Sequence, residues 1–211
     1  MKENSKISSV VIRRLPRYRR YLEELMKKGV ERVSSKELSS LIGYTASQIR
    51  QDLNNFGGFG QQGYGYNVRT LYEQISSIIG LDKEYKMVII GSGNLGQAIA
   101  NYANYYKSGF QVCNMFDINP RLIGLSINGI EVLDYELLPE YLKETQIDIG
   151  IICTNKDNAQ EVATVLCQGN VRGIWNFAPQ DLIVSQSVAL ENVHLSDSLH
   201  ALTYYLHRGE E

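Results

Sequence analysis

Three glycines with the spacing G-x-G-x-x-G, Gly91, Gly93 and Gly96, carry the clearest chemical signal in this sequence of 211 residues. They directly follow an apolar run, 86–90, and precede a predicted helix, which is the setting in which such a loop binds the pyrophosphate of a dinucleotide. Glycines permit the tight turn and the close approach of the backbone, and N–H groups at the helix N-terminus attract the phosphates. The cofactor-binding residues predicted in the loop are Gly91, Ser92, Gly93, Asn94, Leu95 and Gly96.

An acidic side chain, Asp117, follows the next predicted strand, 21 positions after Gly96. A carboxylate at this point accepts hydrogen bonds from the ribose hydroxyls of adenosine and repels a 2′-phosphate. The sequence therefore favours NAD+ and NADH over NADP(H). The alternative is that Asp117 only shapes the turn Asp117-Ile118-Asn119-Pro120.

Charge is divided unevenly along the chain, although the net charge is only −2. Residues 1–80 contain 13 basic and 7 acidic residues, a net charge of +6, and residues 81–211 contain 8 and 16, a net charge of −8. A basic block joined to an acidic block indicates two domains with different partners. A basic block binds a polyanion such as nucleic acid favourably, through Coulomb attraction and counterion release.

Two capping boxes, Ser34 with Glu37 and Thr45 with Gln48, mark the starts of two short helices, and Gly43 lies between them. Two short helices joined by a glycine-containing turn indicate a helix-turn-helix. The helices predicted in this block span about 15–28, 35–42, 46–55 and 68–79.

The segments around the helix-turn-helix complete the first domain. Pro16 is expected in the first turn of the first helix, where its missing N–H costs little. Segment 56–66 is rich in glycine and aromatic residues, which predicts a short β-hairpin. Three helices followed by such a hairpin indicate a winged helix.

The helix predicted over 46–55 has the composition of a helix that reads base edges. Ala46, Ile49 and Leu53 lie on its apolar face, together with Phe56 just beyond it, and its other positions are polar. In the major groove Arg pairs with guanine, and Gln or Asn with adenine. The alternative is a winged helix used only for protein contacts. The predicted DNA-binding residues are Arg14, Arg17, Lys36, Ser47, Gln48, Arg50, Gln51, Asn54, Gln61 and Tyr64.

Apolar strands alternate with helices in the second block, which predicts an α/β fold with a parallel, Rossmann-like sheet. A last helix is expected over about 196–208, capped by Ser196 or Asp197. The predicted domains are 1–80, 81–195 and 196–211. The predicted strands cover 86–90, 110–116, 147–153 and 173–177, and the predicted helices cover 94–107 and 158–168.

Several classes of protein are disfavoured. The cysteines Cys113, Cys153 and Cys167 are odd in number and lack a C-x-x-C pair, which argues against a disulfide framework or a metal site and leaves a redox role of a thiol open. No apolar run approaches the ~20 residues of a membrane span, and the N-terminus lacks the apolar core of a signal peptide, so a cytoplasmic protein is expected.

Catalysis is the less economical interpretation. After the α/β block only about 20 residues remain, which is too few for a substrate domain. All three histidines, His194, His200 and His207, lie in that tail, where each is expected on a helix surface or at an interface instead of acting as a general acid. The chain is therefore expected not to be an enzyme. Two alternatives stay open: a small NAD-dependent oxidoreductase with an accessory basic domain, and a CoA-ligase-like nucleotide-binding module that acts as a scaffold.

With these motifs in place, the sequence resembles the Rex family of redox-sensing transcriptional repressors. The resemblance spans nearly the whole chain, and the combination of a winged helix, G-x-G-x-x-G and Asn-Phe-Ala-Pro is far more specific than any single motif. The matching stretches are 21–25, 34–38, 45–53, Phe56-Gly57, 63–66, 91–96, Phe116-Asp117 and Asn176-Phe177-Ala178-Pro179.

The resemblance implies a homodimer that binds operator DNA, represses genes when NADH is scarce and leaves DNA when NADH binds. It implies that the tail helix is swapped onto the partner subunit and that Tyr102, Phe177, Ala178 and Leu195 line a nicotinamide pocket.

The resemblance also implies a switching network, in which Arg20 and Tyr102 interact with an acid near the tail helix. This chain departs from the pattern, because His194 occupies the place of that acid and Asp197 is the nearest alternative. A second departure is Gln51, which stands where many relatives carry a Lys.

Overall fold

The computed structural model describes residues 7–57, 59, 64–102 and 109–208, and the chain divides into two compact units, 1–83 and 84–211. Each unit has its own hydrophobic core, as two domains with different tasks require. Of the predicted DNA-binding residues, Gln61 lies outside the described ranges, as do residues 58, 60, 62 and 63 of the predicted hairpin. In the described part of the chain, no helix is long and apolar enough to span a bilayer, and no group of three or more His, Cys, Asp or Glu side chains is placed to hold a metal.

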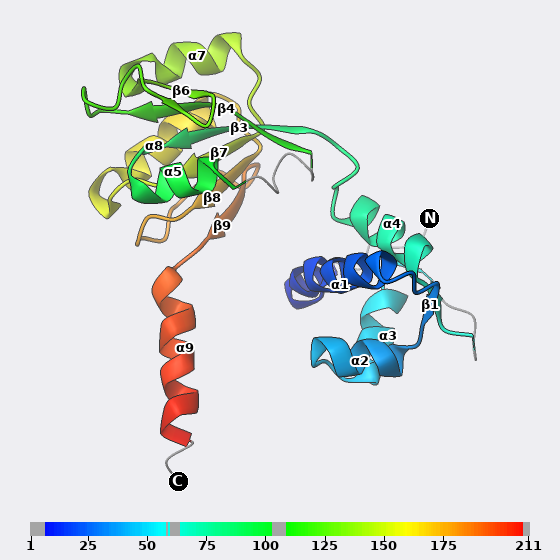
Figure 1. The fold of residues 1–211 in the computed structure, drawn as a ribbon. Coiled ribbons are helices and arrows are strands. Elements are labelled where there is room, and N and C mark those ends of the chain that lie inside the picture. The colour runs from blue at the N-terminus through cyan, green and yellow to red at the C-terminus, as the bar shows by residue number, and fades with distance from the viewer. Residues whose placement is uncertain (1–6, 58, 60–63, 103–108, 209–211) are drawn as a thin grey trace. The chain divides into compact units, whose positions relative to one another are not determined.

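The first unit is a small helical domain with a two-stranded ribbon (Figure 1). Its antiparallel ribbon pairs Val33 with Tyr66. The core contains Leu15, Leu22 and Ile49, all almost fully buried. In chain order the elements are α1 (Ser9–Lys27), β1 (Arg32–Val33), α2 (Ser35–Ile42), α3 (Ala46–Asn54), β2 (Tyr66–Asn67) and α4 (Val68–Ile78).

Both predicted capping boxes are confirmed. The hydroxyl of Ser34 accepts from the N–H of Glu37, whose carboxylate accepts from the N–H of Ser34, and Thr45 and Gln48 do the same for α3. Gly43 ends α2 with a φ of +81°, a left-handed conformation that glycine adopts without steric cost. The turn between α2 and α3 is thus specified locally.

The position of Pro16 was predicted wrongly. The helix begins at Ser9, after the cap Ser8, so Pro16 lies inside α1 instead of in its first turn. A proline there removes one backbone hydrogen bond and normally kinks or ends a helix. Burial of Val11, Leu15 and Tyr18 in the core offsets that cost, because the apolar stripe continues across the proline.

The second unit is built on a seven-stranded sheet in the order β5-β6-β4-β3-β7-β8-β9, parallel except for the edge strand β5. The six parallel strands have the order of a dinucleotide-binding Rossmann sheet, in which the winding reverses beside β3. In chain order the strands are β3 (Tyr85–Ile90), β4 (Phe110–Asp117), β5 (Ser126–Ile127), β6 (Ile130–Asp134), β7 (Ile149–Ile152), β8 (Gly173–Asn176) and β9 (Ala189–Asn192).

Helices cover both faces of this sheet, which explains the continuous apolar strands (Figure 1). Val88 and Ile90 pack with α7 and α8 on one face, whereas Met87 and Ile89 pack with α5 on the other. The remaining elements are α5 (Asn94–Ala100), the short 3-10 helix η1 (Tyr135–Leu137), α7 (Leu138–Glu144), α8 (Lys156–Gln168) and α9 (Leu195–Arg208).

In the second unit, the helices predicted over 94–107 and 196–208 differ from the structure at their ends. Helix α5 ends at Ala100 instead of continuing to 107, and residues 103–108 are outside the described ranges. Helix α9 begins at Leu195, so Ser196 and Asp197 lie within its first turn and neither caps it. The backbone N–H of Asp197 already donates to the carbonyl of His194, which extends the helix upstream.

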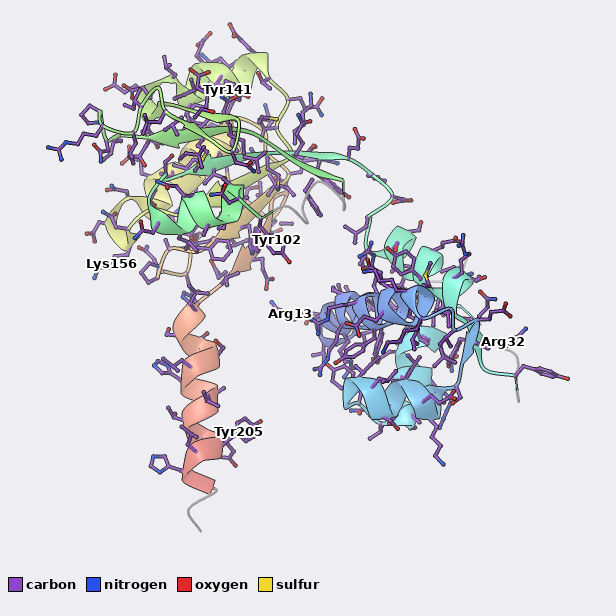
Figure 2. All side chains as sticks on the ribbon, viewed as in Figure 1. Arg13, Arg32, Tyr102, Tyr141, Lys156 and Tyr205 are labelled. Carbon is purple, nitrogen blue, oxygen red and sulfur yellow. The ribbon has the colours of Figure 1, made fainter. Side chains whose placement is uncertain are left out.

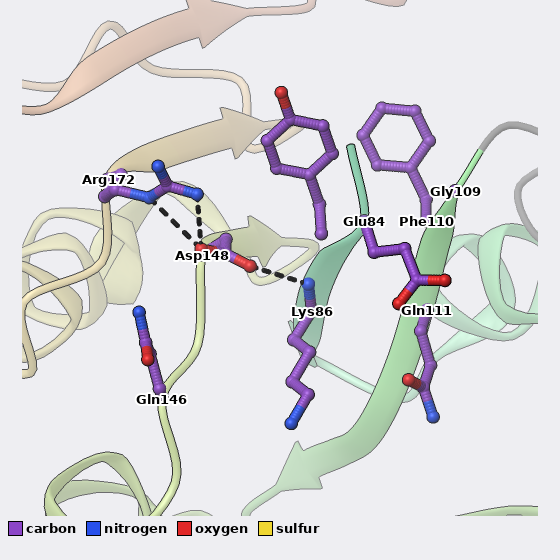
Figure 3. Close-up of a pocket in the computed structure, with 9 residues that line it drawn as sticks. Glu84, Lys86, Gly109, Phe110, Gln111, Gln146, Asp148 and Arg172 are labelled. Carbon is purple, nitrogen blue, oxygen red and sulfur yellow. Dashed lines mark hydrogen bonds and ion pairs between the residues drawn. The ribbon is translucent and has the colours of Figure 1, made fainter. Parts of the chain in front are cut away.

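The amino edge of the sheet is fastened by one carboxylate, Asp148, beside a hollow of about 520 Å³ (Figure 3). It accepts from the backbone N–H of Lys86 at 2.9 Å and from Arg172 Nε and Nη2 at 3.1 and 2.5 Å. Asp148 therefore joins the starts of β3 and β8 across β7. Because both oxygens of its carboxylate are bound by neighbouring strands, we assign it a structural role.

Candidate nucleotide pocket and nucleic-acid interface

A pocket of about 370 Å³ opens at the carboxyl ends of β3, β4 and β7, where the winding of the sheet reverses. Ligands of open α/β sheets bind at such a point. Of the predicted cofactor residues, Gly91, Gly93 and Asp117 line this pocket, and the other seven do not. The full lining is Ile90, Gly91, Gly93, Phe116, Asp117, Ile118, Tyr135, Cys153, Thr154, Asn155, Asn158, Glu161 and Val162.

The glycine loop has the conformation that its spacing predicts. Gly91 has a φ of +97°, and a Cβ there would lie 2.7 Å from the carbonyl oxygen of Cys153. A Cβ on Gly96 would overlap the carbonyl oxygen of Gly91, so only glycine allows this close packing of α5 on the loop. By contrast, Gly93 caps α5 and faces open space, leaving room for a ligand beside the helix N-terminus.

Asp117 is held rigidly against that loop. One carboxylate oxygen accepts from the N–H of Ser92 at 2.6 Å, and the other accepts from the N–H of Asn119 at 2.8 Å. A carboxylate has about four lone-pair sites, so both oxygens can still accept from ribose hydroxyls. The structure shows the turn role of Asp117 and leaves its carboxylate able to accept from a ribose, so the two alternatives are compatible.

Sequence reasoning missed the far wall of the pocket. Tyr135 follows β6, Thr154 and Asn155 follow β7, and Glu161 comes from α8. The rule that ligands bind beyond the carboxyl ends of parallel strands could have found the pair after β7, because the strand and the following helix were both predicted. Tyr135 and Glu161 required knowledge of which strands are neighbours.

Thiol chemistry at the pocket is disfavoured by burial. Cys153 lines the pocket, and desolvation raises the pKa of its thiol to about 12. The thiolate, which is the reactive form, is therefore scarce at neutral pH. Burial also raises the pKa of Cys113.

The residues predicted for the nicotinamide end occupy different places. Phe177 packs on Trp175 with ring centroids 4.6 Å apart, and Ala178 is buried. Asn176 fixes the turn that follows β8. Its side chain accepts from the N–H of Ala178 and donates to the carbonyl of Gln180. Tyr102 is half exposed just after α5 (Figure 2).

The predicted switch residue His194 has an acidic partner that the sequence did not reveal. Its Nε2 lies 3.0 Å from Oδ1 of Asp181, 13 residues earlier in the chain. This hydrogen bond raises the pKa of His194 above its usual 6.5. The third predicted switch residue, Arg20 on α1, lies over the ring of Tyr21.

We expect the pKa of His194 to lie above its usual 6.5, because its protonated form is bound by Asp181. Stability from this pair is present below the unfolded pKa and is lost as pH rises through the folded one. NMR titration of the His194 ring measures this pKa. D181N should lower the pKa of His194, and an unchanged pKa would contradict the pairing.

Helix α3 presents the polar surface that readout of DNA requires. Ile49 and Leu53 are buried, and the predicted contacts Ser47, Arg50 and Asn54 are exposed. Gln51 is exposed as well, whereas the Gln48 side chain is engaged in the capping box. Arg50 Nη1 donates to the hydroxyl of Ser35 at 3.0 Å, which holds the guanidinium beside the start of α2.

The predicted DNA contacts outside α3 differ in whether their side chains are exposed or engaged by other residues. Lys36 and Tyr64 are exposed, and Arg32 lies over the ring of Tyr64. Arg17 lies over the ring of Tyr44 at 5.1 Å. Arg14 is turned inward, to Asp52.

Two family profiles match the chain, one within the first unit and the other almost entirely within the second. One is described as a putative DNA-binding protein N-terminus and matches residues 6–54. The other is described as a CoA binding domain and matches residues 82–180.

A winged helix with an exposed polar helix, joined to a Rossmann domain with an open dinucleotide pocket, defines a transcription factor controlled by a small ligand. The chain is 59% identical over its whole length to the redox-sensing transcriptional repressor Rex of Thermoanaerobacter pseudethanolicus, covering 94% of that protein. It is 60% identical to the Rex repressor of Clostridium botulinum strain Loch Maree, with both chains fully covered. The chain belongs to the Rex family of redox-sensing transcriptional repressors.

Solved structures agree with this assignment. RSP in complex with β-NAD+ and operator DNA matches with a TM-score of 0.92 and 60% identity, over 97% of this chain and 94% of that one. RSP in complex with β-NADH matches with a TM-score of 0.90 and 56% identity, over 98% and 97%. The predicted fold class, a winged helix followed by a Rossmann-like domain, is confirmed.

Proposed function

We propose that this repressor binds operator DNA as a homodimer when NADH is scarce and is released when its Rossmann domain binds NADH. The observation that carries the proposal is the pairing, in one chain, of the exposed polar helix α3 with a pocket walled by Gly91, Gly93 and Asp117. The crystal structures of RSP with operator DNA and with NADH support it.

Both NAD+ and NADH are proposed as regulatory ligands. NAD+ carries a positive nicotinamide ring and NADH a neutral one, so an uncharged pocket favours NADH. A ligand shifts DNA binding only by its differential affinity for two states of the dimer. A hundredfold difference supplies about 2.7 kcal/mol. The proposed cofactor residues remain Gly91, Ser92, Gly93, Asn94, Leu95, Gly96, Tyr102, Asp117, Phe177 and Ala178.

On the DNA side, α3 is proposed to enter the major groove, with phosphate contacts from neighbouring elements. A dimer carries two such helices, which must meet half-sites one helical turn, or a multiple of it, apart. We infer that binding of NADH moves the two helices out of that spacing. The proposed contacts are Arg17, Lys36, Ser47, Gln48, Arg50, Gln51, Asn54, Gln61 and Tyr64.

The dimer is proposed to form through α9. Every described side chain of this 14-residue helix is exposed, and Leu199, Leu202 and Leu206 share one face. Tyr205 also projects outward from the helix (Figure 2). An amphipathic helix of this length is marginal unless its apolar face is covered, and a second copy of the chain can cover it. Residues Arg20, Tyr102 and His194 are proposed to couple this interface to ligand binding.

We further infer that the protein is not an enzyme and works in the cytoplasm without a metal. The relatives are named as repressors, and operator DNA is the proposed partner. The oxidoreductase alternative predicts turnover of an alcohol, aldehyde or hydroxy acid with NAD+. Absence of NADH production, in protein that binds NADH, would support the proposal.

The direct test is a titration of the purified protein against the operator duplex used with RSP. Affinity is measured without cofactor, with NAD+ and with NADH. We expect NADH alone to weaken binding, by about 100-fold for the 2.7 kcal/mol given above. Equal affinity under the three conditions would contradict the proposal.

The cofactor preference is expected to depend on Asp117. D117A removes the ribose acceptor and the charge that repels a 2′-phosphate, so NADH binding should weaken about 10-fold while NADPH binding improves. Fluorescence titration with both cofactors measures the change. D157A, which removes an exposed acid from the first turn of α8, serves as the control. An unaltered preference in D117A would show that the ribose is held elsewhere.

A further inference from the structure

A carboxylate is buried on the helix that is proposed to read DNA. Asp52 lies on α3 at the border between the side of the helix that faces the core and the side that faces solvent. The residue is only 2% exposed. Burial of a charge is costly unless the charge is paired and hydrogen-bonded. Its neighbours Ile49 and Leu53 already supply the apolar anchor of α3, so the carboxylate has another task.

Both oxygens of this carboxylate bind side chains of one other helix. Oδ1 accepts from Arg14 Nη2 at 2.7 Å, and Oδ2 accepts from the hydroxyl of Tyr18 at 2.5 Å. Arg14 and Tyr18 lie one turn apart on α1, and Tyr18 is almost fully buried. Burial and the bond to Asp52 raise the pKa of Tyr18, so its hydroxyl stays a donor at neutral pH.

The same helix also contacts the turn before α3. The guanidinium of Arg14 lies 5.6 Å from the ring centroid of Tyr44, and that of Arg17 lies 5.1 Å from it. Tyr18 meets Tyr44 edge-on, with centroids 6.0 Å apart. Helix α1 therefore contacts the turn before α3 through Tyr44 and the last turn of α3 through Asp52.

Apolar packing and hydrogen bonds to Asp52 restrict the rotation of α3 to different extents. Apolar packing is not directional, and it leaves α3 free to turn slightly about its own axis. A turn of about 20° moves the tip of a side chain by about 2 Å on a helix of this size, which exceeds the tolerance of a base-edge hydrogen bond. Two charge-assisted bonds to one carboxylate do restrict that turn.

We infer that Asp52, held by Arg14 and Tyr18, is a positioning residue that sets the rotation of α3 and thereby the sequence specificity of DNA binding. This inference rests on the proposed function, and it assigns Arg14 to the support of α3 instead of to a phosphate. Loss of the clamp should weaken operator binding more than binding to unrelated DNA, because phosphate contacts tolerate small displacements better than base contacts do.

The experiment compares full-length variants on two duplexes, the operator used with RSP and a shuffled duplex of the same length and composition. D52N keeps the shape and removes the charge, and Y18F removes one hydroxyl and keeps the ring. Y72F is the matched control, since the hydroxyl of Tyr72 accepts from Arg19 at 2.6 Å and joins α1 to α4 instead of α3. Fluorescence anisotropy and thermal melting are recorded for each protein.

We expect D52N to bind the operator about 10- to 100-fold more weakly, Y18F about 3- to 10-fold more weakly, and both to bind the shuffled duplex within about twofold of wild type. Y72F should keep the ratio of the two affinities even if its melting temperature falls. If D52N does not fold, the ratio in Y18F decides.

Two results would overturn the inference. Equal losses on both duplexes would show that α3 is merely less stable, and unchanged ratios would show that the clamp has no part in readout. A wild-type protein that does not distinguish the duplexes would instead overturn the proposed function, and this inference with it.

Discussion

Placing an acid in the apolar face of α9 is expected to produce a monomer that has lost operator binding. L202D introduces a charge between Leu199 and Leu206, in the surface proposed to bury against a second copy. Burial of an unpaired carboxylate is costly, so the dimer should dissociate at micromolar concentrations. A monomer engages one half-site at a time and loses the gain from linked binding, which is about 100- to 10,000-fold.

The control for this variant is H200D, which places the same acid on the opposite face of α9. It should remain dimeric and bind DNA as the wild type does. Sedimentation velocity gives the oligomeric state, and anisotropy with the operator used with RSP gives the affinity. A dimeric L202D with wild-type affinity would show that the chains associate elsewhere.

A side chain at Gly93 is expected to create a repressor that no longer responds to NADH. A Cβ there meets no protein atom within 4 Å, so G93V should fold normally. It would, however, occupy the space in which the backbone approaches a pyrophosphate, and NADH affinity should fall by at least about 100-fold. Operator binding without cofactor should be unchanged, and added NADH should no longer release the DNA.

Calorimetry with NADH and anisotropy with the operator duplex measure these two quantities separately. G96A is the informative comparison, because a Cβ there overlaps the carbonyl oxygen of Gly91 and should lower the melting temperature as well. Wild-type NADH affinity in G93V would contradict the assignment of this loop to the pyrophosphate.

The local elements of this protein were predictable because each is determined by residues close together in the sequence. Both capping boxes and helix α2 were predicted to the residue, since their hydrogen bonds join positions three apart. The buried strand β3 and the glycine loop that follows it were also predicted from local features, a continuous apolar run and the spacing of three glycines. Pro16 was one of the exceptions, because burial of residues along α1 outweighs the local preference of proline.

The sequence by itself determined two domain types, a dinucleotide loop with its acid, and a polar helix suited to DNA, because those features are periodic or short-range. Only the tertiary structure decided which side chains meet across the fold. It paired His194 with Asp181, brought Tyr135 and Glu161 to the pocket of Gly91, and tied Asp52 to α1. Such contacts join residues 13 to 70 positions apart, and they depend on strand order and helix packing, for which spacing along the chain gives no rule.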